Sequence, residues 1–101
     1  MKFALLTCLL LAAAYFGTAQ ADVAAGRSTY AARGCIGCHG AGGVSVVATN
    51  PSLKGRNADF VRKNLSDFRS GARKHPVMNA MAAGLSDTDI ENLAVYIDSL
   101  Q

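Results

Sequence analysis

Two cysteines and a histidine lie close together in the segment Cys35-Ile36-Gly37-Cys38-His39. Residues three and four apart share one face of a helical turn, so Cys35, Cys38 and His39 can all point at the same group. The Cys-x-x-Cys-His spacing is typical of covalent haem attachment. In such a site the two thiols bond to the two haem vinyl groups, and the imidazole reaches the iron from one side. The segment therefore predicts one covalently attached haem c, held by Cys35 and Cys38, with His39 as an axial iron ligand.

Two other kinds of site use a Cys-x-x-Cys pair. A redox dithiol is one, but it is expected beside strand–helix alternation, and the sequence shows none. Half of a zinc site is the other. A closed zinc site needs four ligands, and beyond this segment the chain after residue 21 offers no further cysteine and one further histidine, His75. Both alternatives are therefore weaker predictions than haem attachment.

The opposite axial position of the iron has three candidate ligands, which are Met78, Met81 and His75. A thioether ligand would saturate the iron and raise its reduction potential, which suits electron transfer. Core packing is the usual role of a methionine. Pro76 restricts the backbone of His75, whose default role is that of a solvated loop histidine. The residues alone leave this choice open.

Three helices are predicted to position these side chains, and each has a polar residue suited to cap its first turn. They span Val23–Arg33 after Asp22, Ala58–Ser70 after Asn57, and the stretch from Ser86 to about Leu100. Three glycines in Gly40–Gly43 predict a loop that continues to Asn50. Gly71–Gly84, which carries the methionines, is predicted to be irregular. No strand is predicted, so the fold class is all-α.

The first 21 residues resemble a secretory signal peptide. Lys2 is followed by an apolar stretch from Phe3 to Phe16 and by the small-x-small site Ala19-Gln20-Ala21. The apolar stretch is shorter than the ~20 residues of a membrane-spanning helix. We expect cleavage after Ala21, leaving a single domain at 22–101 with no membrane span. Cys8 would be removed together with the signal peptide. In the remaining domain the apolar helix faces are accounted for by one core and one haem, so a monomer is expected.

Charge is distributed unevenly along the sequence, although the net formal charge is only +3. From Val23 to Asn79 there are nine Lys and Arg residues against two Asp, whereas the stretch from Ala80 to the end has four acidic and no basic residues. Such a molecule could be steered electrostatically onto an acidic partner. The alternative is that these charges are ordinary solvated helix faces.

From Asp22 to its end, the chain resembles the class I c-type cytochromes of the small bacterial type, similar to the single-haem domains of dihaem carriers. The likeness rests on residues spread over the whole domain: Gly26 and Tyr30, Cys35, Cys38 and His39, Pro51–Gly55, Met78, Leu85-Ser86-Asp87, and Leu93 and Tyr96. It implies a cytochrome c fold of three main helices around the haem. It also implies that the axial methionine lies seven residues before Leu85, which is Met78 and not Met81.

The resemblance implies further roles for residues around the haem. The Pro51 carbonyl would accept a hydrogen bond from the second imidazole nitrogen of His39. Gly26 and Tyr30 would meet Leu93 and Tyr96 where the first and last helices cross. Arg56 and Arg62 are candidate partners for the haem propionates, and nothing in their spacing favours either.

The function implied by this resemblance is that of a one-electron carrier in the periplasm, because haem is attached to such proteins outside the cytoplasm. It would not be an enzyme, its partners would be redox proteins, and no nucleic-acid partner is expected. Arg33, Lys54 or Arg73 would help to dock a partner near the exposed haem edge. The alternative function is a haem enzyme or gas sensor with an open sixth coordination position, which a well-placed Met78 disfavours.

Overall fold

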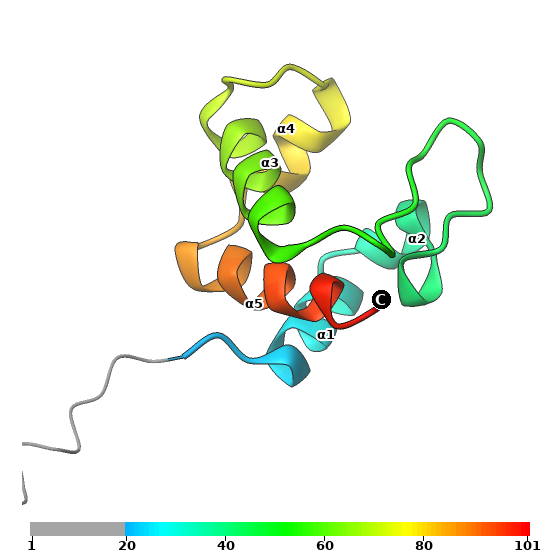
Figure 1. Cartoon of the computed structure of the whole chain (residues 1–101). Coiled ribbons are helices and arrows are strands. Elements are labelled where there is room, and N and C mark those ends of the chain that lie inside the picture. The colour runs from blue at the N-terminus through cyan, green and yellow to red at the C-terminus, as the bar shows by residue number, and fades with distance from the viewer. Residues whose placement is uncertain (1–19) are drawn as a thin grey trace, which may run out of the picture.

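A computed structural model describes residues 20–101 (Figure 1). Residues 1–19, most of the predicted signal peptide, lie outside the described residues. The elements are α1 (Val23–Ala32), α2 (Cys35–His39), a 3₁₀ turn (Ala41–Gly43), α3 (Ala58–Ser70), α4 (Pro76–Ala83) and α5 (Asp87–Asp98). No strand occurs in residues 20–101, which confirms the all-α prediction. The three predicted helices are the three longest, and α2 and α4 are shorter additions.

The first and last of the long helices, α1 and α5, cross at close range (Figure 1). A Cβ atom on Gly26 would lie 2.0 Å from the carbonyl oxygen of Asn92 and 2.6 Å from Cβ of Tyr96. Only glycine therefore allows this approach. One turn further along α1, the rings of Tyr30 and Tyr96 lie 5.5 Å apart, and Leu93 is 2% exposed. The predicted helix crossing is confirmed.

The predicted N-terminal caps of the long helices are present. Asp22 accepts a hydrogen bond from the Ala24 N–H at 2.8 Å, and Asn57 accepts one from the Phe60 N–H at 2.8 Å. Ser86 and Asp89 bond reciprocally to each other's backbone N–H, forming a capping box. Capping depends only on residues within one turn, which is why the sequence located these helix starts.

The prediction that Gly71–Gly84 is irregular is wrong, because Pro76–Ala83 forms α4. Pro76 occupies the first turn, where its fixed φ suits a helix and its missing N–H costs nothing. His75 caps the helix, since its Nδ1 accepts the N–H of Met78 at 3.2 Å. The helix packs against α3, and Gly84 follows its last residue.

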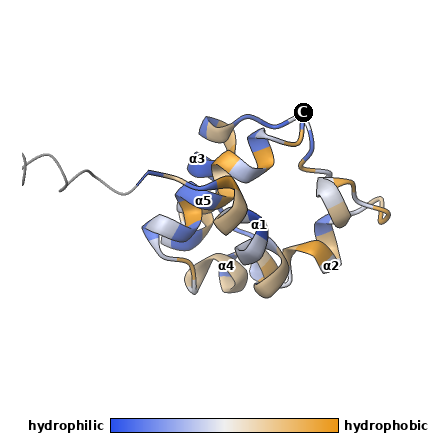
Figure 2. Cartoon of the chain, turned by 90° about the horizontal axis from the view of Figure 1, so that it is seen from below, coloured by the Kyte–Doolittle hydropathy of each residue, from blue (hydrophilic) through white to orange (hydrophobic). Residues whose placement is uncertain are grey.

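The core lies between α5 and the two helices α1 and α3 that pack against it. Its buried side chains are Tyr30, Val61, Phe68, Ala82, Leu85, Ile90, Leu93, Ala94, Tyr96 and Ile97. The loop that follows α2 extends away from this core and carries hydrophobic residues at its far end (Figure 2). Val46 in that loop is 94% exposed.

Candidate functional site

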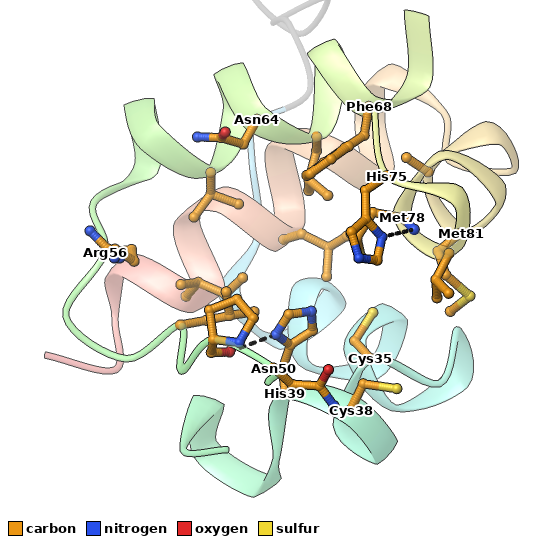
Figure 3. Close-up of a pocket in the computed structure, with 18 of the residues that line it drawn as sticks. Cys35, Cys38, His39, Asn50, Arg56, Asn64, Phe68, His75, Met78 and Met81 are labelled. Atoms are coloured by element: carbon orange, nitrogen blue, oxygen red, sulfur yellow. Dashed lines mark hydrogen bonds between the residues drawn. The ribbon is translucent and has the colours of Figure 1, made fainter. Parts of the chain in front are cut away.

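A cavity of about 530 Å³ opens between α2 on one side and α3, α4 and α5 on the others. Cys35, Cys38, His39, Met78 and Met81 all line it, although they come from two helices far apart in the sequence. Figure 3 shows the two cysteines and His39 on the α2 side of the cavity, and the two methionines on the α4 side. The structure therefore brings together every residue that the sequence singled out as a haem ligand.

The orientation of the His39 ring is fixed by a backbone carbonyl. Its Nδ1 lies 2.8 Å from the carbonyl oxygen of Pro51, as the resemblance implied. A carbonyl oxygen can only accept a hydrogen bond, so Nδ1 must carry the proton and donate it. The lone pair is thereby left on Nε2, which is the tautomer that a metal-binding imidazole needs.

Tyr30 supports the same segment from α1. Its hydroxyl donates to the carbonyl oxygen of Gly40, the residue after His39, at 2.7 Å. Burial raises the pKa of Tyr30 to about 12, so the hydroxyl stays protonated and keeps this bond over a wide pH range. Burial also raises the pKa of the Cys35 thiol, whereas Cys38 is exposed. The Tyr30 hydrogen bond links α1 to Gly40, the residue that follows His39 at the end of α2.

Met78 and Met81 differ in their surroundings, although both belong to α4. Met78 is partly buried and packs against the core. Met81 is 38% exposed, and its terminal methyl is 3.9 Å from the position of a Cβ on Gly34. Met81 therefore lies beside the start of α2, while Met78 is held by the packing of α4 against the body of the domain.

His75 is exposed, as the sequence suggested, but it also has a structural role as the cap of α4. It also lines the cavity, and its ring meets the Phe68 ring edge-on with centroids 6.5 Å apart. Its Nδ1 lone pair is engaged by the Met78 N–H. The signal for this role was Pro76, because a proline in a first helical turn marks the preceding residue as a cap.

The two arginines left undecided by the sequence have different environments. Arg56 lines the cavity and lies over the Phe60 ring, 4.6 Å from its centroid. Arg62 does not line it, and instead forms paired hydrogen bonds to both carboxylate oxygens of Glu91 at 2.6 and 2.9 Å. A third arginine, Arg73, lines the cavity and lies over the Phe68 ring.

The cavity fits a haem. Its volume falls within the ~300–1,000 Å³ of cofactor pockets, and its walls are mostly apolar, as a porphyrin face requires. Arg56 and Arg73 supply positive charge suited to carboxylates such as propionates. Within residues 20–101, no three His, Cys, Asp or Glu side chains gather as ligands for a single metal ion, which a closed zinc site would need.

Residues 21–97 match a protein family described as "Cytochrome C oxidase, cbb3-type, subunit III". Cytochrome c-554(548) of Halomonas halodenitrificans is 36% identical in an alignment of 81 residues, which covers 77% of this chain and 95% of that protein. The "Thiosulfate dehydrogenase electron acceptor" of Stutzerimonas stutzeri is 39% identical over 89 residues, covering 80% of this chain. The chain spans only 41% of that second relative.

A crystal structure of reduced cytochrome c4 from Pseudomonas stutzeri aligns with 84% of this chain and has a TM-score of 0.68 at 33% identity. The chain spans 53% of that structure. Cytochrome c4 of Acidithiobacillus ferrooxidans shares the fold, with a TM-score of 0.72 at 23% identity. The predicted cytochrome c fold is confirmed by these two structures.

Proposed function

This chain belongs to the class I c-type cytochromes, and from that premise we propose that it carries single electrons between redox proteins in the periplasm. One covalently attached haem c is its cofactor, and it is an electron carrier rather than an enzyme. Cys35 and Cys38 would hold the haem covalently, and His39 and Met78 would ligate its iron. When bound, the haem supplies an iron that alternates between the ferric and ferrous states.

The observation that carries this proposal is the placement of His39 and Met78 on opposite sides of one apolar cavity. With a ligand from each side, the iron would have no open position for a substrate. Pro51 holds His39 in the metal-binding tautomer, and the core packing of α4 holds Met78. The apolar walls exclude water, so little solvent has to rearrange when the charge of the site changes.

The ligand assignment is tested by optical spectra of the exported, haem-loaded protein in both redox states. Wild-type protein should be low-spin and should show the weak sulfur-to-iron band in the ferric form. Met78→Ala should abolish that band, whereas the matched variant Met81→Ala should keep it. Ready binding of carbon monoxide to the reduced wild type at neutral pH would instead favour the haem enzyme or gas sensor.

Periplasmic location is supported by the signal-like residues 1–21, and by the fact that haem is attached to proteins of this family outside the cytoplasm. The mature protein should begin at Asp22, the residue that caps α1. Mass spectrometry of the protein from a periplasmic extract measures this start directly. Retention of residues 1–21 in the membrane fraction would refute the cleavage. Among residues 20–101, no helix has the length and hydropathy to cross a bilayer.

Partner docking is proposed to use the basic residues near the cavity. Arg33 lies 3.7 Å from the Asp89 carboxylate, so part of its charge is offset within the domain. Lys54 and Arg73 make no ion pair with any of residues 20–101. Lys54→Glu should therefore slow association with an acidic redox partner more strongly at low salt than Arg33→Glu does. If both charge-reversal variants associate with the partner at the wild-type rate at every ionic strength, electrostatic docking is refuted.

A further inference from the structure

The carboxamide of Asn79 joins the start of α4 to the end of α3. Its Nδ2 donates to the carbonyl oxygens of Phe68 and Arg73, each at 2.8 Å. Its Oδ1 accepts the backbone N–H of His75 at 2.9 Å. Both donors and the acceptor of this amide are therefore used, and they reach three separate points of the chain.

These bonds surround the backbone of Met78. On one side, the His75 ring accepts the Met78 N–H, and on the other side Asn79 follows directly in the chain. The Asn79 N–H also donates to the His75 carbonyl oxygen at 2.8 Å, closing the first turn of α4. Met78 thus lies in the turn between His75 and Asn79. These two residues are hydrogen-bonded to each other through the Asn79 backbone N–H and through the Asn79 side chain.

This turn needs outside support. α4 has only eight residues, and isolated helices shorter than about 12–15 residues are marginal in water. A methionine side chain has three rotatable bonds, so its own rotamers do not fix the position of its sulfur. The position of Met78 therefore depends on how firmly the helix backbone is held against α3.

We propose that Asn79 is a positioning residue for Met78: its three hydrogen bonds set the place of the first turn of α4 and hold the thioether toward His39. The proposal rests on the proposed function, in which Met78 is the axial ligand. Asn79 itself does not line the cavity, although its three hydrogen-bond partners Phe68, Arg73 and His75 do. Its effect on Met78 would therefore pass through the backbone that these bonds hold in place.

A competitor for the sixth iron position measures this effect. Exogenous imidazole binds the ferric protein only when Met78 leaves the iron, so its apparent affinity reports how firmly Met78 is held. Asn79→Ala removes all three bonds and should tighten imidazole binding about tenfold and weaken the sulfur-to-iron band. A tenfold change corresponds to about 1.4 kcal/mol, the net contribution of one or two hydrogen bonds.

Two further variants separate positioning from general destabilisation. Asn57→Ala makes the same chemical change at the first turn of α3, where Asn57 caps the helix away from the methionines. It should lower the melting temperature but leave the imidazole affinity within about twofold of wild type. Asn79→Asp keeps the acceptor for His75 but loses both donors, so it should also tighten imidazole binding. This variant serves as the test if Asn79→Ala does not fold.

The outcomes are distinguishable. Wild-type imidazole affinity and an unchanged sulfur-to-iron band in the Asn79 variants would overturn the positioning role while leaving Met78 as the ligand. An equal tightening in Asn57→Ala would also overturn it, because the effect would then be general loosening. If the wild type and Met78→Ala have identical ferric spectra, the ligand assignment fails and the positioning role fails with it.

Discussion

Adding one methyl group at Gly26 should separate the two helices on which the domain is built. In Gly26→Ala the new Cβ would lie 2.0 Å from the backbone carbonyl oxygen of Asn92, whereas ordinary contacts begin at 3.4 Å. The obstacle is backbone, so no side-chain rotation relieves it, and α1 and α5 would have to move apart by about 1.4 Å. Overpacking of this kind costs about 1–3 kcal/mol, and a backbone clash belongs at the upper end.

Alanine is the better helix former by about 1 kcal/mol, so the net loss of stability is about 2 kcal/mol. For a domain of this size, such a loss lowers the melting temperature by about 8–16 °C. Thermal unfolding of the haem-loaded protein, followed by circular dichroism, measures the shift. Gly37→Ala is the matched control, because a Cβ there meets nothing within 4 Å. If Gly26→Ala melts at or above the wild-type temperature, the close helix crossing is not what requires glycine.

Two further predictions concern the pH dependence of stability. The folded pKa of Tyr30, about 12, exceeds the ordinary value of 10.0, so its stabilising contribution is complete below pH 10 and is lost as pH rises through 12. Urea unfolding should show a loss of about 2.7 kcal/mol over that range in wild type relative to Tyr30→Phe; parallel curves would contradict the burial argument. The hydrogen bonds from Arg62 lower the pKa of Glu91, so that contribution is present above the ordinary glutamate pKa and disappears as pH falls through the folded value. Arg62→Ala should therefore lose less stability than wild type on acidification. If the free energy of unfolding falls equally in both proteins as the pH is lowered, the Arg62–Glu91 pair does not stabilise the fold.

What the sequence predicted correctly depends on local patterns. Cys35, Cys38 and His39 lie within five residues, so their common direction follows from helical geometry alone. The caps at Asp22, Asn57 and Ser86 act within one turn of their helices. The choice of Met78 over Met81 came from a family register and not from the residues themselves. The structure adds a difference in burial between the two methionines that points the same way.

What the sequence did not predict depends on contacts between distant segments. α4 was missed because glycines at both ends suggested a loop, and because histidine is an uncommon cap. Asn79 gave no signal at all, since its partners Phe68 and Arg73 are separated from it by a turn whose path the sequence does not specify. An asparagine in the first turn of a helix that begins with His-Pro has no distinctive pattern by itself.

The uneven charge along the sequence reflects helix pairing more than surface asymmetry. Basic side chains of α3 meet the acidic end of the chain when α3 packs on α5: Arg62 pairs with Glu91, and Arg69 pairs with Asp87 at 2.6 Å. Arg33, at the end of α1, approaches Asp89 in the same way. Much of the apparent dipole between the two parts of the chain is thereby neutralised inside the fold.

The positive charge that remains has a different distribution from the one the sequence suggested. Among residues 20–101, five basic residues form no ion pair: Arg27, Lys54, Arg56, Arg73 and Lys74. Of these, Arg56 and Arg73 line the haem cavity. If the propionates of a bound haem engage those two arginines, the unpaired positive charge left near the cavity is that of Lys54 and Lys74. The salt dependence of electron exchange would then report a few specific charges at the cavity rim, and not the charge of the sequence as a whole.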